Sequence, residues 1–350
     1  MQKVTILWWT AGFGKWLAEY IADNFPKQTE ITITGRNQER WEEVSKSVWC
    51  FYNPDNIDSV KDADIVIISV PIFITNETIK EVAPHMKSGA LLADVTSIKK
   101  TPSEHMKKYA PEDVLVIPVH PMFWPYIKKI SGQVFVLTPE EKTKKDPRYV
   151  FLKKFLEENN ANIEETSAEE HDKMMAVVQG LTHFVLFVLW DTIRKLDISV
   201  EYSQKFVSPV YKLLVSTVAR YMNQNPGLYA DIQMHNDEIL NVHEVFMESA
   251  NLFNSIVKRK DEKEFVSQIN HASEHFGPSA EEWQKYTDKI VYLIWKQINY
   301  IKDNIGKQML IENIYTKDIL NVVIWDFDGK NIILENGEKK DINEWVAVIE

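Results

Sequence analysis

The sequence predicts three successive regions: an α/β region built on a doubly wound parallel sheet, an all-helical region, and a small C-terminal β-meander. Three observations lead to this prediction. Short β-branched runs alternate with amphipathic stretches in the first half, helical apolar periodicity replaces them from about residue 167, and two hairpin dipeptides follow residue 305. We expect domain boundaries that give residues 1–166, 167–304 and 305–350.

The first region contains apolar runs that are short and rich in β-branched residues, as in the strands of a buried parallel sheet. These runs are Lys3–Leu7, Glu30–Thr34, Asp64–Val70, Ala90–Val95, Val114–Val119 and Gln133–Leu137. Amphipathic stretches between them indicate helices, namely Lys15–Phe25, Gln38–Lys46, Glu77–Ala83 and Ser103–Tyr109. Sheets of this kind bind ligands at the carboxyl ends of their strands.

The second region carries helical periodicity in the segments 168–196, 201–223, 227–258, 261–276 and 280–304. Within the first, Met174–Trp190 is apolar on nearly every side, so we expect it to be buried in the domain core or in a subunit interface. In the C-terminal region, Asp328-Gly329 and Asn336-Gly337 are typical of type I′ hairpins. The apolar runs beside them, Leu320–Trp325 and Asn331–Leu334, indicate a β-meander that packs on the helices.

Composition excludes several classes of protein. With 350 residues, 45% of them hydrophobic and 26% charged, the chain is neither collagen-like nor largely disordered. The single cysteine, Cys50, excludes a disulfide framework, and the net charge of −11 disfavours nucleic acid or an anionic membrane as the partner. No signal peptide is recognisable, and the longest apolar stretch is shorter than a bilayer span requires. We therefore expect a cytoplasmic protein.

Two glycines follow the first strand, where a Rossmann-type fold binds the pyrophosphate of a dinucleotide. Gly12 and Gly14 fit the last glycines of this turn, and Thr10 and Phe13 lie within it. Trp9 stands at the first glycine position and does not fit. On this motif alone, a phosphate-binding loop and an ordinary strand–helix turn are equally open.

Other candidates for ligand binding follow later strands at the same edge of the sheet. Arg36, which has no acidic neighbour, suits the 2′-phosphate of NADP better than the ribose hydroxyl of NAD, although it could equally be a solvated arginine. Ser69 and Pro71 end a later strand, and their position predicts that they line the cofactor crevice. Ser97 follows the next strand, where it could line the crevice or cap a helix.

Histidines and cations supply the remaining candidates. His120 lies at the same sheet edge, and an imidazole with a pKa near neutrality suits proton acceptance, although a lone histidine is more often structural. His183 lies in the apolar helix, where a hydrogen-bonded core position is the usual one. Lys212 and Arg220 are eight residues apart and project to one side of a helix. They would bind a dicarboxylate if they face a cleft, and would need no function if they face water.

Together these motifs resemble those of the prephenate dehydrogenases of tyrosine biosynthesis, particularly the archaeal type. The motifs are Gly12–Trp16, Thr34–Asn37, Asp94–Lys99, His120–Phe123, His171–Lys173, Gln179–His183, Ser208–Tyr211 and Gln224–Ile232. The resemblance implies an oxidoreductase that converts prephenate to 4-hydroxyphenylpyruvate with hydride transfer to NADP, or to NAD as the alternative. It also implies a homodimer formed through the helical domain.

The resemblance implies a role for each matching residue. His120 takes the proton of the ring hydroxyl of the substrate, and Ser97 helps to hold this histidine. Arg220 binds a substrate carboxylate, His183 lines the substrate pocket, and Lys212 stands where some members have a second cation. The spacing of His235, His243, His271 and His275 does not indicate a metal site, so we expect none. His171-Asp172-Lys173 opens the apolar helix and could simply cap it.

Three tryptophans depart from the family pattern, since members typically have glycines where this chain has Trp8, Trp9 and Trp124. All three are expected in or beside the cofactor crevice, where their bulk would occupy the volume of a dinucleotide. The alternative hypothesis is therefore a catalytically impaired homologue that acts as a dimeric scaffold or ligand-binding protein. A dehydrogenase of the 3-hydroxyacid or imine-reducing type ranks lower, because it leaves Gln179–His183 unexplained.

Overall fold

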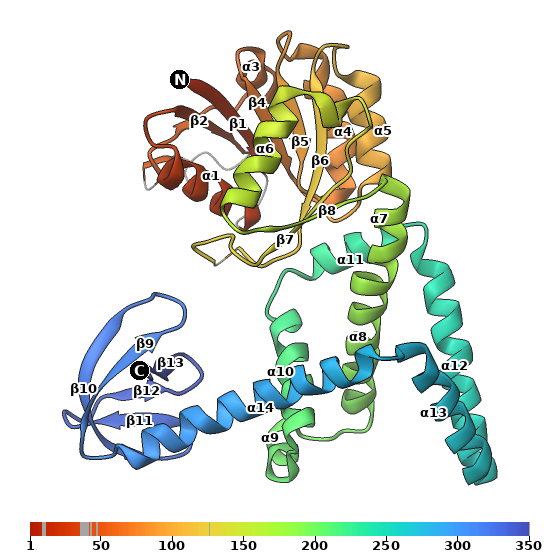
Figure 1. The fold of residues 1–350 in the computed structure, drawn as a ribbon, viewed down its shortest axis with the longest axis vertical. Helices are drawn as coiled ribbons and strands as arrows, with labels where there is room; N and C mark the ends of the chain where they lie inside the picture. The colour runs from red at the N-terminus through yellow and green to blue at the C-terminus, as the bar shows by residue number, and fades with distance from the viewer. Residues whose placement is uncertain (9–11, 36–41, 43, 47, 126, 350) are drawn as a thin grey trace. The chain divides into compact units, whose positions relative to one another are not determined.

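The computed structural model describes residues 1–8, 12–35, 42, 44–46, 48–125 and 127–349. It consists of two compact units, residues 1–250 and 251–350, whose helices and strands are labelled in Figure 1. The division between the units lies within helix α12 (Ile239–Arg259). The three-domain division expected from the sequence stays a prediction.

A mixed sheet forms the centre of the first unit, with the strand order β3-β2-β1-β4-β5-β6-β7-β8 among the described residues. The strands are β1 (Gln2–Trp8), β2 (Thr29–Thr34), β3 (Phe51–Tyr52), β4 (Ile65–Ser69), β5 (Leu91–Asp94), β6 (Leu115–Pro121), β7 (Val134–Leu137) and β8 (Asn162–Glu165). The chain order reverses between β1 and β4, which pair in parallel. The doubly wound sheet predicted from the sequence is therefore confirmed, and its crevice lies at the carboxyl ends of these strands.

Two details of the sheet differ from the prediction. β7 runs antiparallel to β6, so the sheet is mixed rather than wholly parallel. No helix occupies the described part of the connection between them, and an antiparallel pair needs no crossover helix. β3 and β8 were not predicted, because β3 is only two residues long and β8 alternates polar and partly buried residues without an apolar run.

Helices cover both faces of this sheet. They are α1 (Phe13–Asn24), α3 (Asn56–Lys61), α4 (Ile72–Val82), α5 (Lys100–Tyr109) and α6 (Pro147–Glu158). Successive residues of β1 point to opposite faces, so Leu7 packs with α3, α4 and α5, whereas Ile6 and Trp8 pack against α1. The core therefore fixes α1 directly over the end of β1.

Trp8 is part of this core. Its side chain is 2% exposed and belongs to the same cluster as Ile6 and Ile33. A Cβ atom on Gly14 would lie 2.6 Å from Cγ of the Trp8 indole, so α1 can pass over the ring only because residue 14 has no side chain. The expectation that Trp8 fills the cofactor crevice is therefore wrong. Trp9 lies outside the described residues.

The first unit continues as helices. They are α7 (Ala168–Met175), a π-helical segment (Ala176–Leu181), α8 (Thr182–Lys195), α9 (Val200–Ser203), α10 (Pro209–Met222), α11 (Pro226–His235) and the start of α12. Residues 168–195 form one continuous helix that is long and apolar enough to cross a membrane by length and composition alone. Met174, Val177 and Val178 are about half exposed, whereas Met175, Ala176, His183 and Leu186 are buried, so only part of this helix lies in the domain core. That its exposed side lies in a subunit interface stays a prediction.

The second unit contains α13 (Glu262–Phe276), α14 (Ser279–Asp303) and an antiparallel sheet of order β12-β11-β10-β9-β13. Its strands are β9 (Gln308–Asn313), β10 (Ile319–Phe327), β11 (Asn331–Leu334), β12 (Lys339–Asp341) and β13 (Trp345–Ala347). Ile301 of α14 lies in the core of this sheet, and Gln297 forms hydrogen bonds with the backbone of Ala347. The predicted meander and its packing on a helix are confirmed.

The hairpin turns differ from the predicted type. Gly329 and Gly337 have positive φ, but Asp328 and Asn336 do not, whereas a type I′ turn requires positive φ at both central residues. The Asp328 carboxylate instead accepts the backbone N–H groups of Lys330 and Asn331. The side chain thus stabilises the turn without left-handed backbone at residue 328.

The contact between Trp8 and Gly14 predicts a strong coupling between the two positions. Gly14→Ala should lower the free energy of unfolding by about 1–3 kcal/mol, because the new methyl group overlaps the indole. In a Trp8→Leu background the same substitution should cost clearly less. Denaturant unfolding of the four proteins of this cycle measures the coupling. An equal cost in both backgrounds would contradict the packing described here.

Candidate active site

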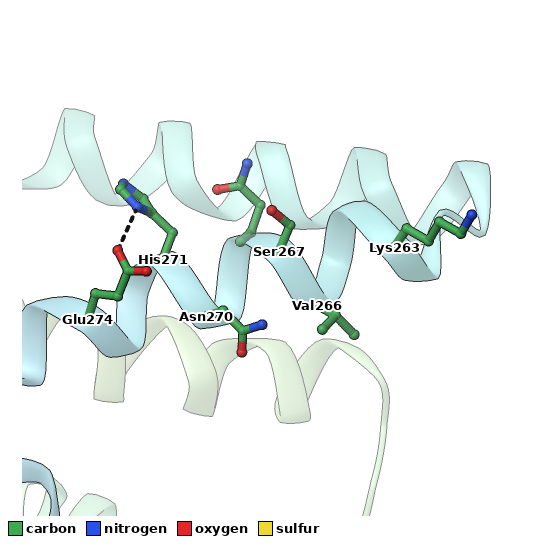
Figure 2. A pocket seen from close by; sticks show the side chains of 7 residues that line it. Lys263, Val266, Ser267, Asn270, His271 and Glu274 are labelled. Carbon is green, nitrogen blue, oxygen red and sulfur yellow. Dashed lines mark ion pairs between the residues drawn. The ribbon is translucent and has the colours of Figure 1, made fainter.

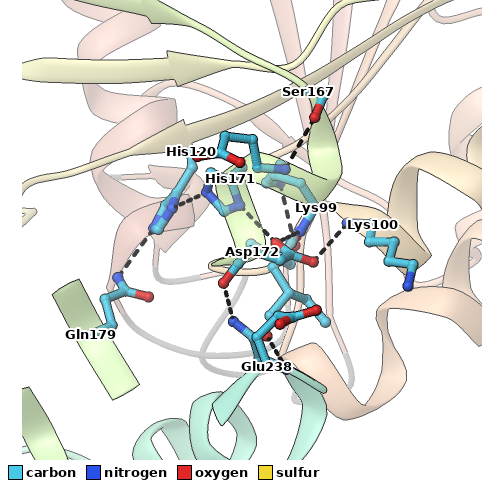
Figure 3. A network of polar contacts seen from close by, with 12 residues as sticks. Lys99, Lys100, His120, Ser167, His171, Asp172, Gln179 and Glu238 are labelled. Carbon is cyan, nitrogen blue, oxygen red and sulfur yellow. Dashed lines mark hydrogen bonds and ion pairs between the residues drawn. The ribbon is translucent and has the colours of Figure 1, made fainter. Parts of the chain in front are cut away.

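His120 is buried at the carboxyl end of β6, with 3% of its surface exposed. Its Nδ1 atom lies 2.9 Å from Nε2 of His171 on α7, and its Nε2 atom lies 3.4 Å from the amide nitrogen of Gln179 (Figure 3). These partners are 51 and 59 residues away in the sequence. The fold of the first unit therefore places three polar side chains from the sheet and the long helix in one buried group.

Asp172 anchors this group to the sheet. One of its carboxylate oxygens accepts a hydrogen bond from Nδ1 of His171 at 2.7 Å and another from the backbone N–H of Lys99 at 2.7 Å. Its second oxygen accepts the backbone N–H of Lys100 at 2.9 Å. These amides lie at the start of α5, where backbone N–H groups have no partner within the helix. The carboxylate thus satisfies the N-terminus of α5 and joins it to α7.

A buried ion pair lies beside this carboxylate. The Lys99 side chain is fully buried and pairs with Asp94, the last residue of β5. The Thr96 hydroxyl also donates to the Asp94 carboxylate, at 2.6 Å. Burial lowers the pKa of Lys99, while Asp94 opposes this change. A cation at this depth acts on every titratable group around it, because little solvent screens its charge.

The two histidines of the group are held neutral. Burial is the main cause that lowers the pKa of His120 well below its usual value, and His171 and the charge of Lys99 add to it. Burial also lowers the pKa of His171, and Lys99 contributes, although the hydrogen bond to Asp172 opposes both. At neutral pH, His120 therefore presents an unprotonated nitrogen.

Gln179 belongs to the π-helical segment between α7 and α8. In this segment the carbonyl of Gly180 accepts a hydrogen bond from Gln233 of α11 at 2.9 Å. A Cβ atom on Gly180 would lie 2.7 Å from Ile239, at the start of α12. The close approach of these helices thus sets the position of Gln179, and π-helical segments often occur at functional sites.

Aromatic contacts connect His183 to Arg220. Trp124, in the loop after β6, stacks on the Arg220 guanidinium, whose central carbon lies 4.2 Å from the ring centroid. Tyr221, the neighbour of Arg220 on α10, contacts both Trp124 and His183, with ring centroids 6.0 and 5.0 Å apart. His183 lies one helical turn after Gln179, which contacts His120. The structure therefore connects His183 to Arg220 through Tyr221 and Trp124, and it connects His120 through Gln179 to the same long helix.

Two other candidates are less closely connected. Lys212 is exposed on α10, and no contact among the described residues joins it to this group. Ser97 is half-buried, and the described residues include no hydrogen bond from it to His120, whose nitrogens contact His171 and Gln179 instead. The catalytic role expected for Ser97 and the substrate-binding role expected for Lys212 stay predictions.

The described part of the turn after β1, Gly12 and the start of α1, has features that phosphate binding requires. Gly12 has a φ of 135°, a conformation open to glycine, with free space where a side chain would be. It precedes the first turn of α1, where no side chain caps the backbone N–H groups. Ser69 pairs in register with Trp8, and Pro71 precedes α4, so both lie at the same edge of the sheet. Thr10 and Arg36 lie outside the described residues.

Phe13 is the remaining candidate for cofactor binding, and its side chain has another role. Its ring lies 5.1 Å from Trp16 and 5.5 Å from Phe123, measured between centroids. The Trp16 indole in turn donates a hydrogen bond to the carbonyl of Ile127 at 2.6 Å. The Phe13 side chain therefore packs the loop after β6 onto α1, so Phe13 can take part in cofactor binding only through its backbone N–H.

Two cavities of the described residues lie elsewhere, and none of the predicted site residues lines them. One, of about 940 Å³, lies over α1 and is lined by residues that include Tyr20, Trp49 and Phe51. The other, of about 500 Å³, lies along α13, where Figure 2 shows the ion pair between His271 and Glu274. Both members of that pair are exposed, so this cavity is an open helix face rather than a built site.

The chain matches family models over most of its length. Residues 18–165 match the nucleotide-binding domain of prephenate dehydrogenase, and residues 167–271 match its dimerization domain. A protein of Methanocaldococcus jannaschii described as a probable arogenate/prephenate dehydrogenase is 39% identical over 341 residues, which cover 97% of this chain and 76% of that protein. The chain belongs to the prephenate dehydrogenase family.

Other members agree in sequence and in fold. The T-protein of Haemophilus influenzae is 32% identical over 234 residues, which cover 66% of this chain and 60% of that protein. The crystal structure of the Aquifex aeolicus prephenate dehydrogenase with hydroxyphenyl propionate and NAD+ has a TM-score of 0.62 at 22% identity, covering 78% of this chain and 96% of that one. The Synechocystis arogenate dehydrogenase has a TM-score of 0.58 at 19% identity, covering 81% of this chain and 100% of that one.

The family assignment confirms the resemblance inferred from the motifs. The chain is a dehydrogenase of tyrosine biosynthesis that uses a nicotinamide cofactor. Sequence reasoning did not identify His171, Asp172 and Lys99 as parts of the site. The sequence alone is compatible with a helix cap at His171-Asp172, and only the pairing of α7 with the start of α5 reveals the partners of these residues.

His183 predicts how stability depends on pH. Burial lowers the pKa of His183 to about 4, so the unfolded chain binds a proton near pH 6.5 that the folded protein does not bind until about pH 4. The unfolded state therefore gains protons first as the pH falls, and the free energy of unfolding decreases through this window. Between about pH 7.5 and pH 4.5, His183→Phe should lose about 2–3 kcal/mol less than the parent protein.

Denaturant unfolding at the two pH values measures this difference. Asn270→Ala, at an exposed position of α13 without an ionisable side chain, serves as the control and should lose as much stability as the parent. If His183→Phe loses as much stability as the parent protein between the two pH values, the pKa of His183 in the folded parent is not lowered.

Proposed function

We propose that this protein catalyses the oxidative decarboxylation of prephenate to 4-hydroxyphenylpyruvate. The observation that carries the proposal is His120, a neutral histidine at the carboxyl edge of the sheet. Its partner Gln179 lies on the same long helix as His183, which aromatic contacts connect to Arg220. A neutral imidazole can accept a proton, and a guanidinium can bind a carboxylate through two parallel hydrogen bonds. Prephenate carries a ring hydroxyl and carboxylates, which require such groups.

In the proposed reaction, His120 takes one proton from the substrate and returns it to the product. Nε2 of His120 accepts the hydroxyl proton as the C–H bond of the same ring carbon breaks, and a carbonyl forms there. The bound nicotinamide supplies the acceptor for the hydride. Loss of the ring carboxylate as CO2 then returns its bonding electrons to the ring, and the resulting phenolate recovers the proton from His120. Because aromatisation drives the reaction, the protein mainly orients its two bound molecules and handles this proton.

Arg220, His183 and the backbone turn position the reactants in this proposal. Arg220 is held flat by Trp124, which fixes the orientation of its fork of donors toward a substrate carboxylate. His183 lies against Tyr221 and Tyr229, with centroids 5.0 Å away in each case, and lines the apolar side of the pocket. Lys212 would supply a second cation for a dicarboxylate.

We propose NADP as the cofactor, with NAD as the alternative. Support comes from Arg36, which follows β2 in a sequence without an acidic neighbour. Gly12, Phe13 and Gly14 would bind the pyrophosphate through their backbone, with Thr10 beside them, and Ser69 and Pro71 would border the nicotinamide half. The hypothesis of an impaired homologue assumes that Trp8, Trp9 and Trp124 obstruct the cofactor crevice. Trp8 packs in the core instead, so this hypothesis has less support.

We also propose a cytoplasmic homodimer. The continuous helix 168–195 leaves Met174, Val177, Val178 and Val188 exposed, and α10 exposes Val210. Exposed apolar side chains grouped on one helix of a protein outside a membrane indicate an interaction surface. A second copy of the dimerization domain would cover it. The first domain would then bind the dinucleotide, while the helical domain completes the substrate pocket.

His120→Asn tests the proposed role of the imidazole. With prephenate and NADP+, and with NAD+ and arogenate in parallel, kcat should fall about 10²–10⁴-fold, because the proton acceptor is lost. The affinity for the dinucleotide should change little. Arg220→Ala is the contrasting variant, and it should mainly raise the KM for prephenate. Steady-state rates and dinucleotide titrations separate these effects, and an unchanged kcat in His120→Asn would remove His120 from the mechanism.

Val178→Glu tests the dimer. The substitution places a charge on the exposed apolar face of the long helix, so it should dissociate the dimer without unfolding the chain. Sedimentation velocity should give twice the chain mass of 40.8 kDa for the parent and the single mass for the variant. Lys195→Glu, at the exposed end of α8, is the control. A monomeric parent protein would contradict the proposal.

A further inference from the structure

The mechanism proposed above uses His120 but not the two residues behind it, His171 and Asp172. We propose that these two are positioning residues, which hold His120 in the tautomer whose Nε2 is unprotonated and directed at the substrate. The inference rests on the proposed function for its catalytic meaning, whereas the tautomer itself is a property of the protein alone. Figure 3 shows the polar contacts that follow one another from Asp172 through His171 to His120 and Gln179.

The hydrogen bonds determine the tautomers one after another. An ionised carboxylate only accepts, so Nδ1 of His171 must carry the proton in its 2.7 Å bond to Asp172. Nε2 of the neutral His171 is then an acceptor, and the 2.9 Å contact with His120 requires a proton on Nδ1 of His120. Nε2 of His120 therefore carries a lone pair. The side-chain amide nitrogen of Gln179, a hydrogen-bond donor, lies 3.4 Å from this Nε2 atom, as expected if Nε2 is an acceptor.

The orientation of Asp172, the first residue of this series, is fixed by contacts that do not involve the histidines. The backbone N–H groups of Lys99 and Lys100 donate to the two oxygens of Asp172, at 2.7 and 2.9 Å. The side-chain amide of Asn236 donates to its backbone carbonyl at 2.7 Å. The two backbone donors thus prevent the carboxylate from rotating, and Asn236 holds the backbone of Asp172, so the acceptor oxygen stays directed at His171.

Charge around the histidines preserves the neutral forms on which the series depends. A doubly protonated His171 would donate from both nitrogens and would force the opposite tautomer on His120. The charged groups that face the pair are Lys99 before α5, Asp94 at the end of β5 and Asp172 on α7. Lys99 and burial oppose protonation of His171, while Asp172 and Asp94 favour it. The balance keeps His171 neutral at neutral pH.

Two variants of His171 separate a positioning role from a structural one. In His171→Gln the amide oxygen can take the place of Nε2 as acceptor while the amide nitrogen donates to Asp172, so kcat should stay within about threefold of the parent. In His171→Leu the Nδ1–H of His120 has no acceptor, and the tautomer with a blocked Nε2 gains population. Here kcat should fall about 10- to 100-fold while the KM for prephenate changes little.

His105→Leu is the matched control. His105 is a half-buried histidine of α5 whose Nδ1 contacts the carbonyl of Thr101, outside the series. Its substitution should leave kcat unchanged, and thermal unfolding of all variants reports their folding. An equal loss of kcat in His171→Gln and His171→Leu would overturn the positioning role, because a general packing defect would affect both.

A second measurement needs no catalysis. Neutron diffraction from deuterium-exchanged crystals of the protein at neutral pH locates the exchanged hydrogens on each imidazole. We expect deuterium on Nδ1 of His171 and of His120, and none on Nε2 of His120. Deuterium on Nε2 of His120 would overturn the inference even if prephenate is turned over. The expected pattern in a protein that does not act on prephenate would instead refute the proposed function and leave the tautomer assignment in place.

Discussion

The carboxylate of Asp172 is the contact on which the arrangement of this protein depends. It accepts two backbone N–H groups at the start of α5 and the Nδ1–H of His171, so one side chain joins the sheet domain to the long helix. Buried donors without acceptors are costly, which makes the junction specific as well as stable. The position of α7 then follows, and with it the positions of the π-helical segment and Gln179.

Two of the tryptophans that depart from the family pattern have defined packing partners. Trp8 lies under α1, which passes over the indole because residue 14 is glycine. Trp124 lies flat against Arg220 and edge-on to Tyr221, so it contributes a surface that holds the guanidinium. A bulky aromatic side chain can therefore replace a glycine when the backbone nearby offers a face without a side chain.

The electrostatics of the site favour neutral imidazoles over strong bases. Burial and the Lys99 cation keep the pKa of His120 low, which makes it a weak proton acceptor that is always available at neutral pH. Such a group suits a reaction whose driving force comes from aromatisation, since it can accept the hydroxyl proton and return it to the phenolate. The cost appears in stability, because buried neutral histidines favour the unfolded state as the pH falls.

The sequence by itself determined the order of the elements and the family of the protein. Apolar periodicity and turn residues act locally, so the main strands, the helical half and the C-terminal meander could be predicted from them, as could the motifs around Gly12, His120 and Arg220. Only the tertiary structure decided the reversal of β7, the direction of the Trp8 side chain and the pairing of His120 with His171. These features depend on contacts between residues far apart in the chain, and no local pattern specifies which buried donors and acceptors will meet.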